Sequence, residues 1–224
     1  MKTIRVSIVC LAVLLLASPM LRAQDLSKYR TFSVGTSLAT VLKHTDQKSA
    51  DVKVIHCRPA LIQELTWWPP NLPGTSFQSD SVEQIRFSFY NGELYKISVT
   101  YDRTSTEGLT ASDMVKSISA KYGQATSVVP EIDPVANDRH EMKQKPVASW
   151  ENSQYSINLV RSSFTNGLEL VIYSKRVNAE AEVAIANALK SEAEKGPQRE
   201  AERQKKVTND LEVMRQKNQK SFRP

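Results

Sequence analysis

The chain has 224 residues, a formal net charge of +6, seven glycines and two cysteines. It has no Gly-rich phosphate loop, no dinucleotide-binding fingerprint and no zinc-site cysteine spacing. Motifs that bind nucleic acids are missing as well. The composition therefore excludes the common nucleotide-binding and zinc-finger classes, and we expect no nucleic-acid partner and no cofactor.

Residues 1–23 have the parts of a secretory signal peptide. Lys2 and Arg5 precede an apolar run over residues 6–17, and the small residue Ala23 marks a cleavage site. A membrane anchor is the alternative, but the run is shorter than the roughly 18 apolar residues that a spanning helix needs. We expect cleavage after Ala23, a periplasmic or secreted protein, and no transmembrane segment in the mature chain.

The mature chain retains one cysteine, Cys57, so it cannot form an intrachain disulfide. Apolar burial alone must stabilise its body, which is long enough for one ordinary domain. We interpret Cys57 as a buried or partly buried structural thiol. A nucleophilic role is the alternative, but the adjacent His56 would point to the opposite face of a strand.

The first expected elements are a helix over residues 36–44 and strands over residues 52–57 and 60–68. Two longer strands then flank Asn91-Gly92, with alternating apolar residues on each side. A two-residue turn would pair Phe87 with Lys96 and mix the polar and apolar faces. We therefore predict a three-residue loop, 90–92, that pairs Phe87 with Tyr95.

A second helix is predicted to start with Thr110 as N-cap, Asp113 as its reciprocal partner, and to stop at Gly123. Three more strands follow at residues 146–150, 153–162 and 167–174, with a turn at Asn166-Gly167. Strands joined by short turns predict an α+β fold, an antiparallel β-sheet with two helices packed on one face. A loose duplication of a helix-plus-strands unit is one interpretation of this order.

Residues 175–224 form a helical tail by composition, rich in Ala, Glu, Lys, Gln and Arg. They hold 12 basic and 8 acidic residues, whereas residues 24–174 hold 15 and 16. We predict two helices broken at Gly196-Pro197. Each has a thin apolar stripe: Val183, Ala184, Ala188 and Leu189 in the first, and Val207, Leu211 and Met214 in the second. Such stripes indicate light docking at most. The tail should therefore extend from the body, either as a passive segment or as a basic surface that includes Lys205, Lys206 and Arg215.

Trp67 and Trp68 are the most distinctive candidate contact residues, because they precede a stiff proline segment. Neighbouring strand residues face opposite ways, so we expect one tryptophan in the core and one outside. Paired aromatic rings suit a partner or carbohydrate surface. The alternative is that they only close the sheet edge.

Acidic residues provide the candidates for chemistry. Asp102 follows a strand, and the 131–141 loop contains oxygen and imidazole ligands that are weak metal candidates: Asp133, Asp138, His140 and Glu141. The loop has neither calcium-loop spacing nor the paired histidines of a zinc hydrolase. We therefore predict a solvated loop, with no metal and no catalytic residue assigned.

The segments FYNGELYKISVTYDRTSTEGLT, DMVKSISAKYG, HCRPALIQEL and SFRP resemble a group of uncharacterised exported bacterial proteins. This resemblance covers most of the mature chain and implies no activity. The helix-plus-sheet unit is also loosely similar to small envelope-assembly lipoproteins and β-lactamase-inhibitor-type domains, which bind other proteins. The chain departs from the former because it lacks a lipid-bearing cysteine.

Together these features predict an exported, non-enzymatic binding module whose partner is a protein or an anionic envelope component. The alternative is an envelope hydrolase that uses acidic residues near Asp102 or in the 131–141 loop.

Overall fold

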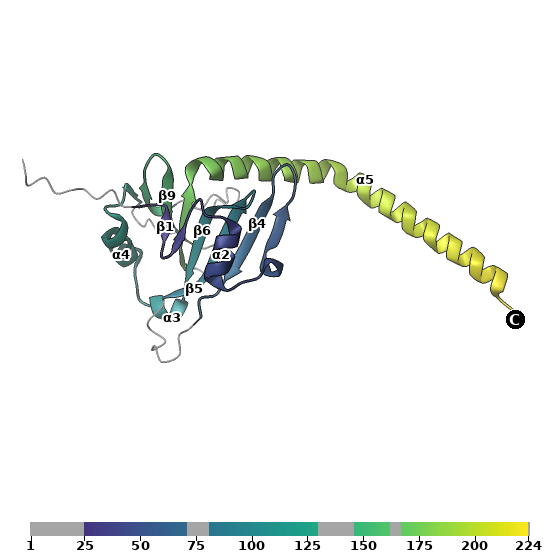
Figure 1. The fold of residues 1–224 in the computed structure, drawn as a ribbon, viewed down its shortest axis with the longest axis horizontal. Coiled ribbons are helices and arrows are strands. Elements are labelled where there is room, and N and C mark those ends of the chain that lie inside the picture. Colours follow the sequence, from purple (N-terminus) through teal and green to yellow (C-terminus); the bar gives the residue numbers. More distant parts are fainter. Residues whose placement is uncertain (1–24, 71–80, 130–145, 162–166, 224) are drawn as a thin grey trace, which may run out of the picture.

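The structure is a computed structural model that describes residues 25–70, 81–129, 146–161 and 167–223. Among them, eight strands form one antiparallel sheet in the order β3-β4-β5-β6-β10-β9-β8-β7, and β1 and β2 form a small separate hairpin (Figure 1). The strands are β1 Lys28–Tyr29, β2 Phe32–Ser33, β3 Lys53–His56, β4 Ile62–Trp67, β5 Val82–Tyr90, β6 Glu93–Tyr101, β7 Ser127–Val128, β8 Pro146–Glu151, β9 Tyr155–Arg161 and β10 Leu168–Ser174. The helices are α2 Leu38–Thr45, η1 Ser49–Asp51, α3 Arg103–Thr106, α4 Ala111–Tyr122 and α5 Lys175–Ser221. The α+β class, with an antiparallel sheet and a helical tail, is thus confirmed.

The sheet consists of two halves with the same order of elements. In the first half α2 precedes β3, β4, β5 and β6, and in the second α4 precedes β7, β8, β9 and β10. Each set of four strands pairs in chain order, and the halves meet where β6 pairs antiparallel with β10. The duplication is therefore present in the topology, although the two halves have little sequence in common.

One face of the sheet carries the main core. Alternate residues of the strands, including Phe87, Ile97, Leu170 and Trp150, are fully buried on this face with Val41 of α2 and with Met114, Ile118 and Tyr122 of α4. The Trp150 Nε1 donates a hydrogen bond of 2.9 Å to the Gly123 carbonyl at the end of α4. Both helices therefore pack on one face, as the apolar alternation predicted.

The turn between β5 and β6 differs from the prediction. Tyr90 pairs with Glu93, so Asn91-Gly92 is a two-residue turn, with φ of 51° and 83°. These positive angles are those of the type I′ turns that suit a hairpin's twist. Ser88 pairs with Lys96 and Phe89 with Leu94, which leaves Tyr95 as the extra residue of a bulge. The bulge returns Phe87 to a position opposite Ile97 and keeps the core face apolar.

The helix α4 begins and ends where the sequence predicts. The Thr110 side chain accepts from the Asp113 backbone N–H, and the Asp113 carboxylate accepts from the Thr110 backbone N–H at 2.9 Å. Gly123, at φ 85°, is the C-cap. Local capping chemistry thus sets both ends of the helix.

The tail is one helix and not two. The helix α5 runs without a break through Gly196 and Pro197. A proline inside a helix removes one hydrogen bond and crowds the preceding turn. The flanking residues are strong helix formers, and a change of direction accommodates the ring. In Figure 1 the first part of α5 lies along the ends of the strands, and the rest leaves the body at an angle.

Candidate interaction surface

The two tryptophans at the end of β4 point to opposite sides. Trp67 packs against the main core, where its ring meets Phe32 edge-on at 5.6 Å between centroids. Trp68 is 61% exposed. The expectation of one ring inside and one outside is confirmed, and it follows from the alternation of side chains along a strand. Residues 71–74 of the proline segment lie outside the described residues.

The first part of α5 docks on the face of the sheet opposite α2 and α4. Val177, Ala181, Ala184 and Ala188 are buried at spacings of four, three and four residues, which place them on one stripe. The first three pack with Ala60, Ile62 and the bulge residue Tyr95. The expectation of light docking over the whole tail is therefore wrong for this segment, because three small alanines let the helix backbone approach the sheet closely.

The predicted apolar residues of this segment are only partly those that dock. Ala184 and Ala188 are buried as expected, but Val183 is 62% and Leu189 54% exposed. The larger aliphatic side chains therefore face solvent.

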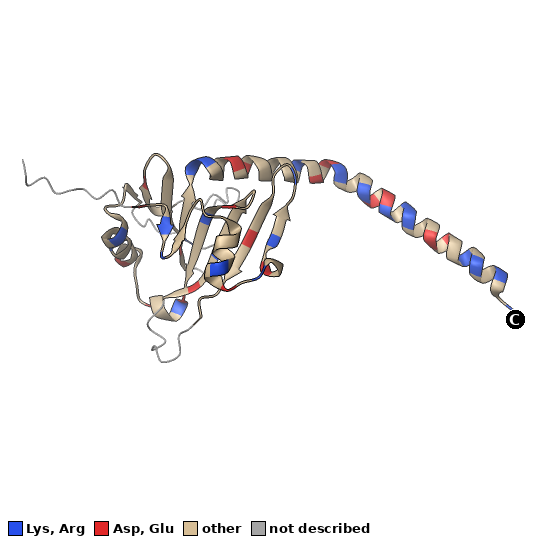
Figure 2. Cartoon of the chain, in the orientation of Figure 1, with Lys and Arg blue, Asp and Glu red and all other residues tan. Residues whose placement is uncertain are grey.

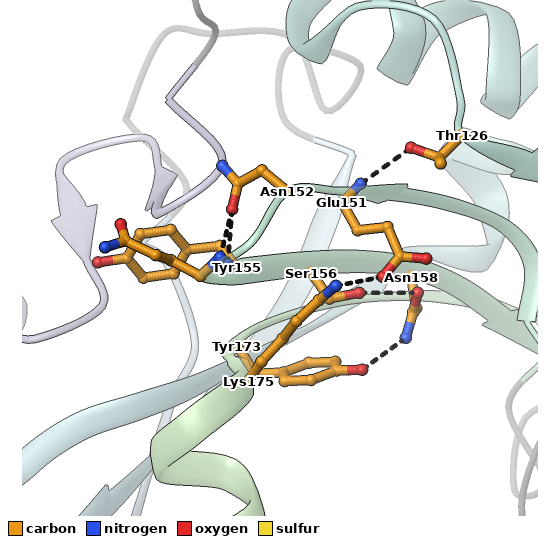
Figure 3. Close-up of polar contacts among 9 residues, drawn as sticks. Thr126, Glu151, Asn152, Tyr155, Ser156, Asn158, Tyr173 and Lys175 are labelled. Carbon is orange, nitrogen blue, oxygen red and sulfur yellow. Dashed lines mark hydrogen bonds and ion pairs between the residues drawn. The ribbon is translucent and has the colours of Figure 1, made fainter.

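A polar network fixes the point where α5 begins (Figure 3). The Lys175 ammonium pairs with the Glu151 carboxylate, and the Lys175 backbone N–H donates 2.9 Å to the carbonyl of Gln154. Nearby, the Asn158 amide donates to the Tyr173 hydroxyl at 3.2 Å and lies 3.3 Å from the Ser156 hydroxyl. These contacts join β8, β9, β10 and α5, so the direction of the helix is set at its first residue.

The turn between β8 and β9 supports the same junction. The Asn152 side-chain oxygen accepts from the backbone N–H groups of Gln154 and Tyr155, both at 2.8 Å. The Glu151 N–H donates 3.1 Å to the Thr126 hydroxyl. Satisfied donors and acceptors of this kind make a rigid anchor.

Charged side chains of both signs gather beneath the docked part of α5. Burial lowers the pKa of the Lys96 ammonium, while the nearby Glu182 carboxylate of α5 raises it. Burial also raises the pKa of Tyr95 to about 12, despite its hydrogen bond with Ser88. Arg86 of β5 reaches across β6 to lie 4.0 Å from Glu169 of β10. The opposite charges compensate one another, as in a structural ion cluster.

An open hollow lies where α5 passes the strand ends. Pro59, Ala60 and Tyr90 line one side, and α5 residues from Ala179 to Asn187 line the other, around a volume of about 480 Å³. Its walls are mainly apolar and also include the polar residues Glu180 and Asn187. The hollow exists because α5 rests on small residues at this position.

Of the candidate catalytic and metal-binding residues, the structure describes Asp102 and leaves the four acidic and histidine residues of the 131–141 loop undescribed. Asp102 is the N-cap of α3, where its carboxylate accepts from the Ser105 N–H at 2.8 Å and hydroxyl at 2.7 Å. The hydrogen bonds from Ser105 lower the pKa of Asp102. Asp133, Asp138, His140 and Glu141 lie outside the described residues. Within the described ranges, no group of three or more His, Cys, Asp or Glu residues is placed to hold a metal ion.

Cys57 is exposed, which corrects the expectation of a buried or partly buried thiol. It follows the last residue of β3 and lies on the connection to β4, where a strand's alternation no longer applies. The neighbouring His56 is the residue that turns inward, with 8% of its side chain exposed.

The predicted basic residues of the tail lie on the part of α5 that leaves the body. We call residues 197–221 the projecting half. Lys205, Lys206 and Arg215 are all exposed there. Arg215 reaches back to Glu212 with two hydrogen bonds of 2.8 Å, which raise the pKa of Arg215 and lower that of Glu212. Figure 2 shows that basic and acidic residues are mixed along this half of the helix.

Sequence reasoning included Ala184 and Ala188 in a weak apolar stripe but missed Ala181, which completes the docked stripe, and the contribution of Tyr95. The four-three-four spacing was visible, but alanine is also the commonest helix former and its presence alone does not indicate docking. The role of Tyr95 depends on a bulge that arises only when two strands pair.

No helix in the part of the chain that the structure describes is long and apolar enough to span a membrane. No protein-family model, curated protein or solved structure matches the chain.

Proposed function

We propose that the mature protein is an exported binding module that engages its partner through the basic face of the projecting half of α5. The observation that carries this proposal is the division of α5 into two parts. Its buried residues end at Ala188, and every described residue from 197 onward is exposed except Glu212. One part is anchored to the body, and the other presents its side chains to solvent along about 37 Å of helix.

The charge of the projecting half favours an acidic partner. Its residues 197–221 include seven basic and four acidic residues. Lys205 and Lys206 are adjacent, so two ammonium groups lie close together on the outer surface. A basic face steers association with an anionic surface over about 8–10 Å at moderate salt. An acidic protein and an anionic envelope component share the chemistry that this face recognises.

Two further observations support the proposal. The N-terminal segment has signal-peptide organisation, which directs the chain to the compartment where envelope components are found. Trp68 offers a second contact on the body, because its large ring is 61% exposed at the end of a rigid strand. Aromatic rings are enriched at the centres of protein interfaces.

Retention of the mature chain on an envelope extract tests the proposal. We expect retention that falls as salt rises, and a marked loss in the double variant Lys205→Glu/Lys206→Glu. The matched control is Lys190→Glu/Lys195→Glu, which changes the charge equally but nearer the docked segment. Equal loss in both variants would show that only total charge matters and would refute a local basic face.

Separate measurements test the other parts of the proposal. Sequencing of the exported protein's N-terminus should start at Gln24. Protease treatment of the extract distinguishes an acidic protein from a non-protein anionic component, because it abolishes retention only in the first case. Trp68→Ala should weaken retention without changing its salt dependence if Trp68 is the second contact.

A further inference from the structure

The projecting half of α5 carries an apolar stripe that no described residue covers. Val207, Leu211 and Met214 are 52%, 61% and 59% exposed, respectively. Their spacing of four and then three residues places them on one side of the helix. Exposed apolar side chains aligned in this way indicate a surface that is buried in an assembly.

The stripe belongs to a longer repeat. Positions spaced alternately by three and four residues run along the helix without interruption: Gln204, Val207, Leu211, Met214, Asn218 and Ser221. This mean spacing of 3.5 residues is that of the a and d positions of a coiled coil. We call this set the seam. It begins seven residues after Pro197, about two turns of helix, where α5 has already turned away from the sheet (Figure 1).

We propose that the seam packs against the same seam of a second copy of this chain, as a parallel two-stranded coiled coil. The inference goes beyond the proposed function, because it assigns a different side of the same helix. Val207 and Met214 occupy d positions, and Leu211 occupies the central a position. The partner is thus an identical helix and not a groove or a membrane surface.

The polar residue Asn218 favours the parallel arrangement. It occupies an a position, so a parallel pair places it opposite the Asn218 of the second copy, where the two amides can hydrogen-bond. An antiparallel pair centred on the apolar residues would place Asn218 opposite Val207 and leave its amide unpaired. An asparagine at an a position helps to specify the register and the oligomeric state of a coiled coil.

Charges beside the seam favour the same pairing. Asp210 occupies a g position and Arg215 the e position five residues later, the two positions that meet across a parallel coiled coil. Each Asp210 would face the Arg215 of the second copy, giving two pairs of opposite charge. Arg215 already bonds Glu212 of its own helix, but its guanidinium has five N–H donors and retains capacity for a second carboxylate.

The basic residues of the proposed function stay outside the seam. Lys205 and Lys206 occupy b and c positions, which face away from the second helix. Dimerisation would therefore leave these ammonium groups accessible and present two copies of the basic face side by side. With three apolar positions per helix the seam is short, so we expect a reversible dimer.

Sedimentation of the mature chain over a range of concentrations tests the proposal. We expect a monomer–dimer equilibrium whose dissociation constant rises about tenfold or more in Leu211→Asp, since the variant places two carboxylates at the seam's centre. The matched control is Val213→Asp, at an outer position 66% exposed, with a constant within about twofold of the parent. A strictly monomeric parent chain, or equal effects of the two variants, would overturn the proposal.

Cysteine cross-linking tests the orientation. In a Cys57→Ser background, Met214→Cys should give an oxidised dimer in high yield, because a parallel pair brings the two d positions together. Gln216→Cys, on the outer side, should not. Asp210→Arg should weaken the dimer, and adding Arg215→Asp should restore it by exchanging the charges. A dimer that persists while Met214→Cys fails to cross-link would exclude the parallel arrangement.

The two proposals fail separately. Lys205→Glu/Lys206→Glu should reduce retention on the envelope extract and leave the dimer intact. Leu211→Asp should weaken the dimer. This expectation does not depend on whether the envelope extract retains the variant.

Discussion

The Nδ1 of His56 lies 3.4 Å from the Oε1 of Glu192, which brings the last residue of the edge strand β3 to α5. The helix begins at the end of β10, so its docked part reaches from the centre of the sheet to this edge. His56 Nδ1 has no hydrogen-bond partner among the described residues, and Glu192 is 59% exposed. The contact is thus a close approach at the end of a docked segment that is held mainly by apolar packing.

We predict that the docked segment is part of the folded body. Truncation after Ser174 should lower the free energy of unfolding by at least about 3 kcal/mol, because it uncovers Ile62 and Tyr95 and removes the four buried side chains of α5. Truncation after Lys195 should leave it within about 0.5 kcal/mol of the full chain. Urea unfolding of both chains measures the difference, and equal stabilities would contradict the docking.

Point substitutions give a finer test of the same contact. Ala181 is 1% exposed against the sheet, whereas Ala186, five residues later, is exposed to solvent. Ala181→Asp should cost about 3 kcal/mol or more, because it buries a carboxylate without a partner. Ala186→Asp, with the same chemical change, should cost less than about 0.5 kcal/mol. Thermal or urea unfolding decides between these outcomes.

The two tryptophans should respond oppositely to truncation of the side chain. Trp67→Ala removes a ring that packs against Phe32 and should destabilise the body by about 2–4 kcal/mol. Trp68→Ala should change the free energy of unfolding by less than about 0.5 kcal/mol, because most of the ring is exposed. Denaturant titrations followed by circular dichroism would show the contrast. A comparable loss in both would indicate that Trp68 is buried in solution.

The turn at Asn91-Gly92 has a stringent requirement for backbone geometry. Gly92 has φ of 83° with open space around it, so Gly92→Ala should cost about 1–2 kcal/mol through backbone strain alone. Gly92→Asn should recover much of this loss, because asparagine tolerates the left-handed conformation. If alanine and asparagine are equally destabilising in urea unfolding, the cost arises from crowding and not from the angle.

The cap of α4 should make stability depend on pH in acid. The hydrogen bonds from the Thr110 side chain and backbone lower the pKa of Asp113. A carboxyl with a lowered folded-state pKa stabilises the fold above its unfolded pKa of about 3.9, and this contribution is lost as pH falls through the folded value. Asp113→Asn should therefore make the decline of stability below about pH 4 less steep, as measured by urea unfolding at several pH values.

Thr110→Ala provides the partner variant for the same cap. It should cost about 1 kcal/mol at neutral pH, the usual cost of losing an N-cap side chain. The double variant Thr110→Ala/Asp113→Asn should cost less than the sum of the two single changes, because both remove the same reciprocal bonds. Strict additivity would show that the two groups act independently.

The parts of the fold that follow from local chemistry could be predicted from the sequence. Thr110 and Asp113 specify the start of α4 and Gly123 its end. The sequence pattern also identified the strands of the main sheet, except the two-residue strand β7. The bulge at Tyr95 could not be predicted, because it depends on how β5 and β6 pair and on the helix that packs over it. A turn of two residues with a bulge and a loop of three residues both keep Phe87 on the apolar face.

Part of the candidate interaction surface could also be predicted from the sequence, and part could not. Exposure of one tryptophan follows from strand alternation, and the exposed basic residues follow from a helix with few apolar positions. The prediction of a break at Gly196-Pro197 was wrong, because one proline does not stop a helix whose flanking residues are strong helix formers. The sequence understated the alanine stripe, since small residues dock only when the opposing surface is close enough to meet them.

The meeting of the two halves at β6 and β10 has a consequence for how the chain is made. Val99 pairs with Leu170, far along the sequence, so the nine-residue strand β6 has no neighbour on one side until the second half has emerged. An unpaired strand edge of this length is a template for pairing with other chains. The long separation also slows closure of the central pair. A nascent first half is therefore the species of this protein most prone to aggregate, and the arrival of β10 ends that exposure.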